Sequence, residues 1–211
     1  MQSTPGVDPR QLPVVFVHGF LARAFTNAPL RDRLRAEGLT CFDVELPGLN
    51  TQDMRRSSAA VGQQVEAILA ESGAARVLLV GVSMGGLIAL HYVRRGGGHE
   101  RIHRMVAVAT PFNGTSTIRL GRGLGAVLGE AARQMHPGAP FIQEITAPPY
   151  PAADIVSIAT HGDPMVHPDA ARLAGARNIV TDFCRWPLGH YCAVLHPKSY
   201  AVFRDALLAS A

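Results

Sequence analysis

The sequence predicts an α/β fold, in which one mostly parallel sheet of about six strands carries helices on both faces. Three observations lead to this expectation. Short apolar runs alternate along the chain with segments of helical periodicity. These runs are apolar at consecutive positions, as in strands that are buried on both faces of a parallel sheet. The length of 211 residues suits a single domain, 1–211, with one core.

The expected elements follow one another in a regular order. The expected strands cover residues 13–17, 39–44, 76–80, 103–109, 154–159 and 177–182. The expected helices cover residues 27–37, 57–72, 84–95 and 197–208, where glycines end the first three and a proline opens the last. Because parallel sheets bind ligands at the carboxyl ends of their strands, functional residues should lie just after strands.

One long segment interrupts this alternation. Residues 111–153 are too many for a plain loop in a compact domain, so they predict an inserted lid or cap. Within this segment Leu120, Leu124 and Leu128 recur at helical spacing. The stripe fits a helix packed on the core and equally fits a lid whose apolar face lines a substrate pocket. The three leucines are therefore candidate substrate-binding residues.

Composition narrows the classes of function. The net charge is +4 and the pI is about 9.3, but no run of five or more like charges occurs, so we expect no nucleic-acid partner. The first twelve residues are polar and hold no apolar run. The sequence as given therefore predicts a cytoplasmic protein, or a secreted one if a leader has been removed.

The cysteines and histidines show no metal-binding spacing, so we expect no metal and no cofactor. The three cysteines are Cys41, Cys184 and Cys192. An odd number in a chain of this size favours buried free thiols, although a bridge between Cys184 and Cys192 is an alternative.

The strongest functional motif is Gly-Val-Ser-Met-Gly at residues 81–85, with Ser83 at its centre. It follows a predicted strand and opens a predicted helix, which is the context that a nucleophile on a strand-to-helix turn requires. Glycines two residues before and after the serine leave room for the sharp turn. The helix start directs its positive dipole end toward a developing oxyanion. The simpler interpretation is a tight glycine turn with an idle serine, and the strand–turn–helix context argues against it.

This motif, together with His-Gly-Phe at residues 18–20, resembles bacterial lipases and esterases of the α/β-hydrolase superfamily. Further segments that are similar to these enzymes follow in the same order, at residues 110–115, 132–142, 163–166 and 189–191. The resemblance therefore covers most of the chain. It implies a minimal α/β-hydrolase fold with a short lid insertion, and a catalytic triad in the order Ser, Asp, His.

A serine nucleophile needs a base, and His190 is the expected one because it lies in a loop between the last strand and the last helix. The rival His196 is better explained as a residue at the start of the last helix. Asp163 follows the fifth strand in a short turn and is expected to orient the imidazole. Asp182, at the end of the last strand, is the second choice for this acid.

The oxyanion hole should be formed by the backbone N–H groups of Phe20 and Met84, while His18 braces the loop that carries Phe20. These residues predict a serine carboxylic ester hydrolase, an esterase or lipase, that acts on a small-molecule or lipid ester through an acyl-enzyme. An acyltransferase, thioesterase or amidase with the same triad is one alternative. A non-catalytic ligand-binding protein on the same fold is another. A transient lipid interface is a further hypothesis, and we expect no obligate protein partner.

Overall fold

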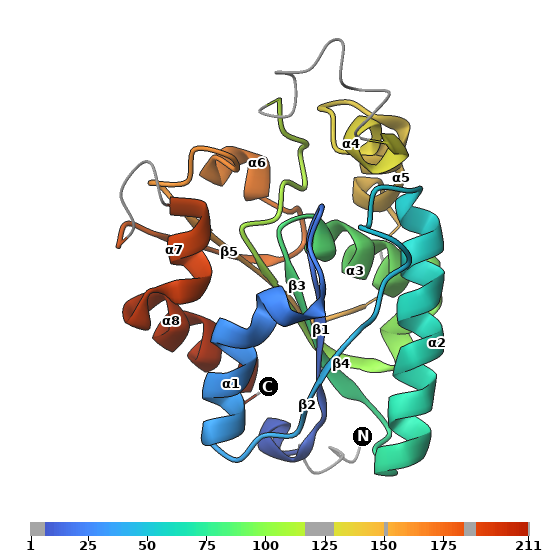
Figure 1. Ribbon diagram of the computed structural model, residues 1–211, viewed down its shortest axis with the longest axis vertical. Helices are drawn as coiled ribbons and strands as arrows, with labels where there is room; N and C mark the ends of the chain where they lie inside the picture. The colour runs from blue at the N-terminus through green and yellow to red at the C-terminus, as the bar shows by residue number, and fades with distance from the viewer. Residues whose placement is uncertain (1–6, 117–128, 150–151, 184–188, 211) are drawn as a thin grey trace.

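The computed structural model describes residues 7–116, 129–149, 152–183 and 189–210 of the chain (Figure 1). Its centre is a sheet of six parallel strands in the order β2-β1-β3-β4-β5-β6, which confirms the predicted α/β class. The strands are β1 (Val14–Val17), β2 (Cys41–Asp43), β3 (Val77–Val82), β4 (Ile102–Val108), β5 (Ile155–Thr160) and β6 (Arg177–Thr181).

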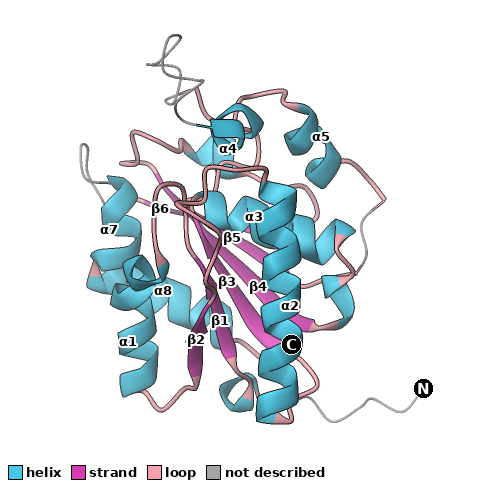
Figure 2. Cartoon of the chain, turned by 45° about the vertical axis from the view of Figure 1, so that its right-hand side comes forward, coloured by secondary structure: helices cyan, strands magenta, loops and turns pink. Residues whose placement is uncertain are grey.

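Helices cover both faces of the twisted sheet (Figure 2). One face carries α1 (Ala28–Ala36), α7 (Gly189–Leu195) and α8 (Pro197–Leu208). The other face carries α2 (Met54–Ser72) and α3 (Met84–Arg95), with α4 (Gly129–Gln134) and α5 (Pro140–Thr146) packed at their upper ends. The short α6 (Pro168–Ala171) and three 3-10 turns, at Pro9–Gln11, Ala24–Asn27 and Gly98–Glu100, complete the described elements.

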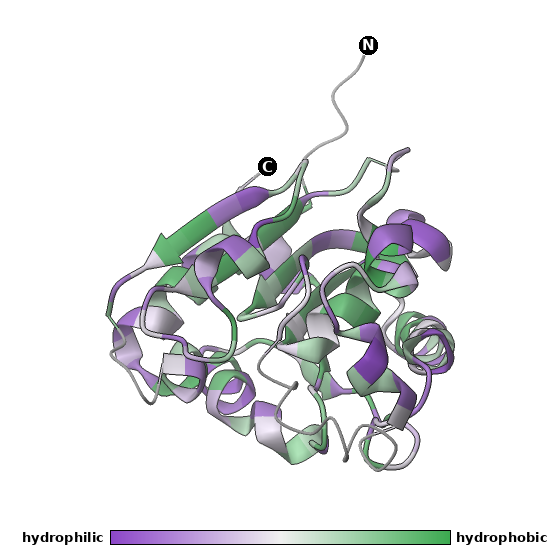
Figure 3. Ribbon diagram, turned by 90° about the horizontal axis from the view of Figure 1, so that it is seen from above, coloured by the Kyte–Doolittle hydropathy of each residue, from purple (hydrophilic) through white to green (hydrophobic). Residues whose placement is uncertain are grey.

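The continuous apolar runs of the strands supply two cores, one on each face. In β1, Val14 and Phe16 pack toward α1 and α8, whereas Val15 and Val17 pack toward α2 and α3. All four side chains are fully buried, because successive side chains of a strand point to opposite faces. Viewed from above, hydrophobic residues gather along the central strands (Figure 3).

The strand order indicates which edge of the sheet binds a ligand. From β1 the chain crosses to β2 on one side, and from β3 it proceeds to β4 on the other. The carboxyl ends of β1 and β3 therefore form a topological switch point, where open parallel sheets bind their ligands. His18 follows β1 and Ser83 follows β3 at this point.

Two of the helices differ from the sequence prediction. Helix α2 starts at Met54, not at Ser57, because Asp53 caps it by accepting a hydrogen bond from the Arg55 N–H at 2.9 Å. Helix α7 was not predicted, and His190 lies in its first turn and not in the expected loop.

The described part of the 111–153 insertion packs on the core. Phe141, Ile142 and Ile145 of α5 are buried against the core face that α2 and α3 cover. Helix α4 is fixed to the start of α2 by Gln134. Its Oε1 accepts from the Met54 N–H at 2.8 Å, and its Nε2 donates to Asp53 Oδ1 at 2.6 Å.

The cysteines differ from the expectation of free thiols. Cys41 is a buried free thiol, as expected, but Cys192 of α7 is disulfide-bonded. Cys184 lies outside the described residues. None of the helices in the described ranges is long and apolar enough to cross a membrane.

Candidate active site

Ser83 stands on a strained turn between β3 and α3. Its backbone angles are φ 54° and ψ −126°, a region that non-glycine residues rarely adopt and that costs about 1–3 kcal/mol. Neighbouring chain segments hold the turn in place: the Ser83 N–H donates to Val108 O at 2.8 Å, and Thr110 Oγ1 donates to Ser83 O at 2.9 Å. Strain that the surrounding structure maintains at a residue lining a pocket is typical of a functional residue.

The glycines of the motif are required by close packing. A Cβ on Gly85 would lie 2.2 Å from Val17 O, and a Cβ on Gly81 would lie 2.5 Å from the Gly86 Cα. Gly86 is equally constrained, since its Cβ would lie 2.0 Å from Thr110 Oγ1. The start of α3 therefore packs directly against β1 and the end of β4, and this contact lifts Ser83 above the carboxyl edge of the sheet.

Asp163 and His190 form the hydrogen-bonded pair that the sequence predicts. Asp163 Oδ2 accepts from His190 Nδ1 at 2.7 Å. The other carboxylate oxygen accepts from the N–H groups of Met165 at 2.8 Å and Val166 at 2.9 Å, and the Asp163 side chain is inaccessible to solvent. Because the carboxylate can only accept, Nδ1 carries a proton and Nε2 is left as the basic nitrogen of the neutral ring.

Gly189 brings the helix that carries His190 against the loop that carries Asp163. A Cβ at Gly189 would lie 1.8 Å from Gly162 O and 2.4 Å from the Asp163 N. The two segments are therefore in backbone contact, and that contact sets the 2.7 Å bond between the acid and the imidazole.

The loop after β1 lies beside the Ser83 turn. An ideal Cβ on Gly19 would be 3.3 Å from Val82 O and 3.8 Å from the Met84 N. Met84 is the first residue of α3, so its N–H has no partner within the helix and is available to an anion. Phe20 is the next residue of this loop. The loop therefore brings the Phe20 N–H to the same side of the sheet as the Met84 N–H.

His18 hydrogen-bonds within the loop that it is expected to brace. It is buried, and its Nδ1 makes a 3.2 Å hydrogen bond with Gly19 O, the atom that must act as acceptor. Burial lowers the pKa of His18, so the imidazole is neutral at pH 7.

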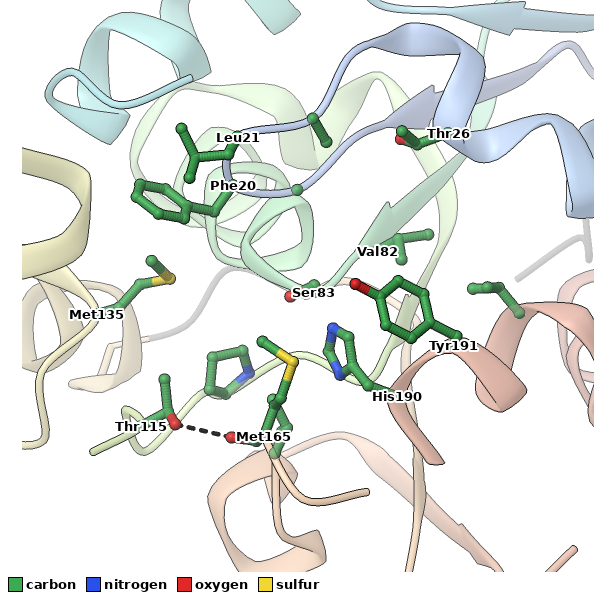
Figure 4. A pocket seen from close by; sticks show the side chains of 15 residues that line it. Phe20, Leu21, Thr26, Val82, Ser83, Thr115, Met135, Met165, His190 and Tyr191 are labelled. Atoms are coloured by element: carbon green, nitrogen blue, oxygen red, sulfur yellow. Dashed lines mark hydrogen bonds between the residues drawn. The ribbon is translucent and has the colours of Figure 1, made fainter. Parts of the chain in front are cut away.

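A cavity of about 320 Å³ opens above Ser83 (Figure 4). The ring of His190 lies next to Ser83 in this view, with Phe20 and Met135 on one side and Tyr191 on the other. A hydrogen bond of 2.7 Å from Thr115 Oγ1 to Met165 O joins two of its walls. The lining is mostly apolar and consists of Gly19, Phe20, Leu21, Ala22, Thr26, Val82, Ser83, Pro111, Thr115, Met135, Met165, Val166, His190, Tyr191 and Val194.

The structure thus brings Ser83, Asp163, His190 and Phe20 together at one edge of the sheet. The predicted substrate-binding residues Leu120, Leu124 and Leu128 lie outside the described residues. The rival base His196 has another role: it caps α8 by accepting from the Lys198 N–H at 3.2 Å. In the described ranges, no three His, Cys, Asp or Glu side chains gather closely enough to hold a metal ion.

Sequence reasoning missed several pocket residues. Met135, Met165 and Thr115 reach the pocket from the insertion and from the acid loop. They lie in segments that resemble related lipases, but none of them was assigned a role from the sequence.

Comparison with known proteins agrees with the predicted fold. The model of the α/β-hydrolase fold family matches residues 13–128, more than half of the chain. The chain belongs to the α/β-hydrolase fold family, and the resemblance stated from the sequence is confirmed. Among curated proteins, no sequence matches this chain.

Solved structures of lipases and an esterase share the fold. Lipase BlEst2 of Bacillus licheniformis, in its mature form, superposes with a TM-score of 0.78 at 18% identity, over 98% of this chain and 96% of that one. Lipase B of Aspergillus fumigatus gives a TM-score of 0.74 at 19% identity, over 94% of this chain and 53% of that one. The metagenomic carboxyl esterase MGS0156 gives 0.68 at 20% identity, over 98% of this chain and 76% of that one.

Proposed function

We propose that the protein is a serine carboxylic ester hydrolase, an esterase or lipase, with Ser83 as nucleophile, His190 as general base and Asp163 as the acid that orients it. The observation that carries the proposal is the 2.7 Å bond between His190 Nδ1 and the buried Asp163, with both His190 and Ser83 lining one apolar pocket. The lipase and esterase names of the structural neighbours point in the same direction.

The proposed mechanism assigns each group one task. His190 Nε2 takes the proton of the Ser83 hydroxyl as Oγ attacks the ester carbonyl carbon. The N–H groups of Phe20 and Met84 stabilise the oxyanion of the tetrahedral intermediate. The C–O bond to the alcohol then breaks, and His190 gives its proton to the departing oxygen. Water, deprotonated by His190, attacks the acyl-enzyme and releases the carboxylic acid and Ser83.

Asp163 supports these reaction steps and stays a carboxylate throughout. During both steps His190 becomes an imidazolium, and the negative carboxylate of Asp163 stabilises that cation and keeps the ring in the productive tautomer. The three hydrogen bonds that Asp163 accepts hold the carboxylate in place during the reaction. The mostly apolar lining favours acyl esters over sugars or peptides as substrates.

The test is hydrolysis of p-nitrophenyl esters from acetate to palmitate by the wild type and by Ser83→Ala. The proposal predicts turnover that falls by more than about 10⁴-fold in Ser83→Ala. Ser72→Ala is the control, because Ser72 lies at the far end of α2, where its hydroxyl donates to Ile68 O. Full activity of Ser83→Ala, or a wild type that hydrolyses none of the esters, would refute the proposal. The chain-length profile separates an esterase from a lipase.

A further inference from the structure

Asn50, in the segment between β2 and α2, is a buried polar residue in an unusual backbone conformation. It has no exposed surface, and its φ is 58°. Asparagine tolerates this left-handed region better than most residues, but glycine adopts it without strain. Burial of an amide without hydrogen bonds costs about 1–3 kcal/mol, so the use of asparagine here requires partners for its side chain.

The side chain of Asn50 finds those partners in two parts of the fold. Nδ2 donates to His18 O at 3.3 Å and to Gly19 O at 3.2 Å. Oδ1 accepts from Ser57 Oγ at 2.8 Å, and Ser57, in the first turns of α2, is itself fully buried. The amide is therefore held by α2 on one side and holds the loop after β1 on the other.

The planarity of the peptide bond gives this contact a consequence at the reaction centre. The carbonyl of Gly19 and the N–H of Phe20 belong to the same peptide group, and in a trans peptide the two point in opposite directions. Fixing Gly19 O therefore fixes the direction of the Phe20 N–H. The hydrogen bonds from Asn50 and His18 hold Gly19 O on the side of the peptide away from the N–H.

We propose that Asn50 is a positioning residue of the oxyanion hole, which fixes the Gly19–Phe20 peptide so that the Phe20 N–H points at the developing oxyanion. The inference rests on the proposed ester hydrolase function. Preorganised donors contribute most of their effect only when they are aimed at the oxyanion, and a misplacement of about 1 Å can cost about 10²-fold in rate.

Two substitutions of Asn50 separate its roles. Asn50→Gly keeps the left-handed backbone and removes the whole side chain. Asn50→Asp keeps the shape and the acceptor for Ser57 but replaces the N–H donor by an oxygen that faces two carbonyl oxygens. In both variants kcat should fall about 10- to 100-fold, with KM changed less than about twofold, because the lost interaction acts in the transition state. Ser57→Ala should show a smaller loss of the same kind.

A second readout distinguishes positioning from general weakening of the fold. An alkyl boronic acid adds to the serine and places a tetrahedral anion in the oxyanion hole, so its inhibition constant should rise in parallel with the loss of kcat. The control is Asn178→Ala. The Asn178 side chain makes three hydrogen bonds with backbone groups of Leu173 and Ala176 near β6, away from the pocket. This variant should lose thermal stability and keep kcat.

Several results would overturn the positioning role of Asn50. Wild-type kcat in Asn50→Gly and Asn50→Asp overturns it, as does a loss of kcat with unchanged boronate affinity or an equal loss in Asn178→Ala. If Asn50→Gly does not fold, Asn50→Asp and Ser57→Ala decide by the same criteria. If the wild type shows no turnover that depends on Ser83, the proposed function itself is wrong, and the role of Asn50 is wrong with it.

Discussion

The contact at Gly189 leads to the sharpest prediction for the site. In Gly189→Ala the new methyl group would lie 1.8 Å from Gly162 O, far inside the 3.0 Å below which Cβ contacts are essentially not observed. The helix and the acid loop must then separate by more than about 1 Å, because both neighbouring atoms are backbone. The bond between His190 and Asp163, 2.7 Å in the wild type, would exceed 3.5 Å and be lost.

The expected loss of kcat follows from the role of the hydrogen bond between His190 and Asp163. Loss of the acid that orients a catalytic histidine lowers kcat by about 10⁴-fold, so partial displacement in Gly189→Ala should cost about 10²- to 10⁴-fold. Overpacking of this kind also destabilises the fold by about 1–3 kcal/mol. The assay is steady-state hydrolysis of a p-nitrophenyl ester, combined with urea unfolding.

The matched control is Gly98→Ala. Its methyl group would lie 2.6 Å from Tyr92 Cε1, so it also overpacks a buried contact, but in the 3-10 turn that precedes β4. It should lower stability and leave kcat unchanged. The reasoning would be refuted by a Gly189→Ala variant that keeps the wild-type kcat, or by an equal loss of kcat in Gly98→Ala.

Three further predictions concern Asp163, the buried histidines and helix α4. Asp163→Asn should lower kcat by about 10⁴-fold at an unchanged circular dichroism spectrum, and a loss below tenfold in the same kinetic assay would contradict the assignment. Burial lowers the pKa of His18 and His91 below 6.5, so the unfolded chain binds more protons than the folded one just below that pH. The contribution of these two histidines to the free energy of unfolding should therefore be fully present above pH 6.5. It should decrease as the pH falls, by at most about 1.4 kcal/mol per pH unit for each histidine. Urea unfolding at pH 7.5 and 5.5 measures this, and a midpoint that rises at the lower pH would disprove it. Gln134→Ala leaves the buried Met54 N–H unpaired and should cost about 1–3 kcal/mol in urea unfolding, whereas an unchanged midpoint would show that α4 is held in another way.

The parts of the fold that follow from local patterns were predictable. The two-sided burial of β1, β3 and β4 produces continuous apolar runs, and these runs predict a parallel sheet. Ser83 is marked by a motif whose glycines are required by backbone contacts less than 3 Å away. Asp163 and His190 follow from the order of strands, because the carboxyl ends of parallel strands meet at one edge.

The features that the sequence did not predict depend on contacts between residues that are distant in the sequence. Asn50 is 31 positions from Gly19, and nothing in its own segment shows that its amide will be buried against that carbonyl. The bonded state of Cys192 and the start of α7 at Gly189 likewise depend on tertiary packing. Propensity and periodicity describe the interactions of a segment with itself, so they miss such residues.

The central claim is that Ser83 is a nucleophile activated by His190 and Asp163. Its most direct test is labelling with a fluorophosphonate, followed by mass spectrometry of the intact chain and of its peptides. The account predicts one phosphonyl group per chain, on Ser83, with labelling lost in Ser83→Ala and slowed at least about 10²-fold in Asp163→Asn. A folded wild type that stays unlabelled, or a label on another residue, would contradict it.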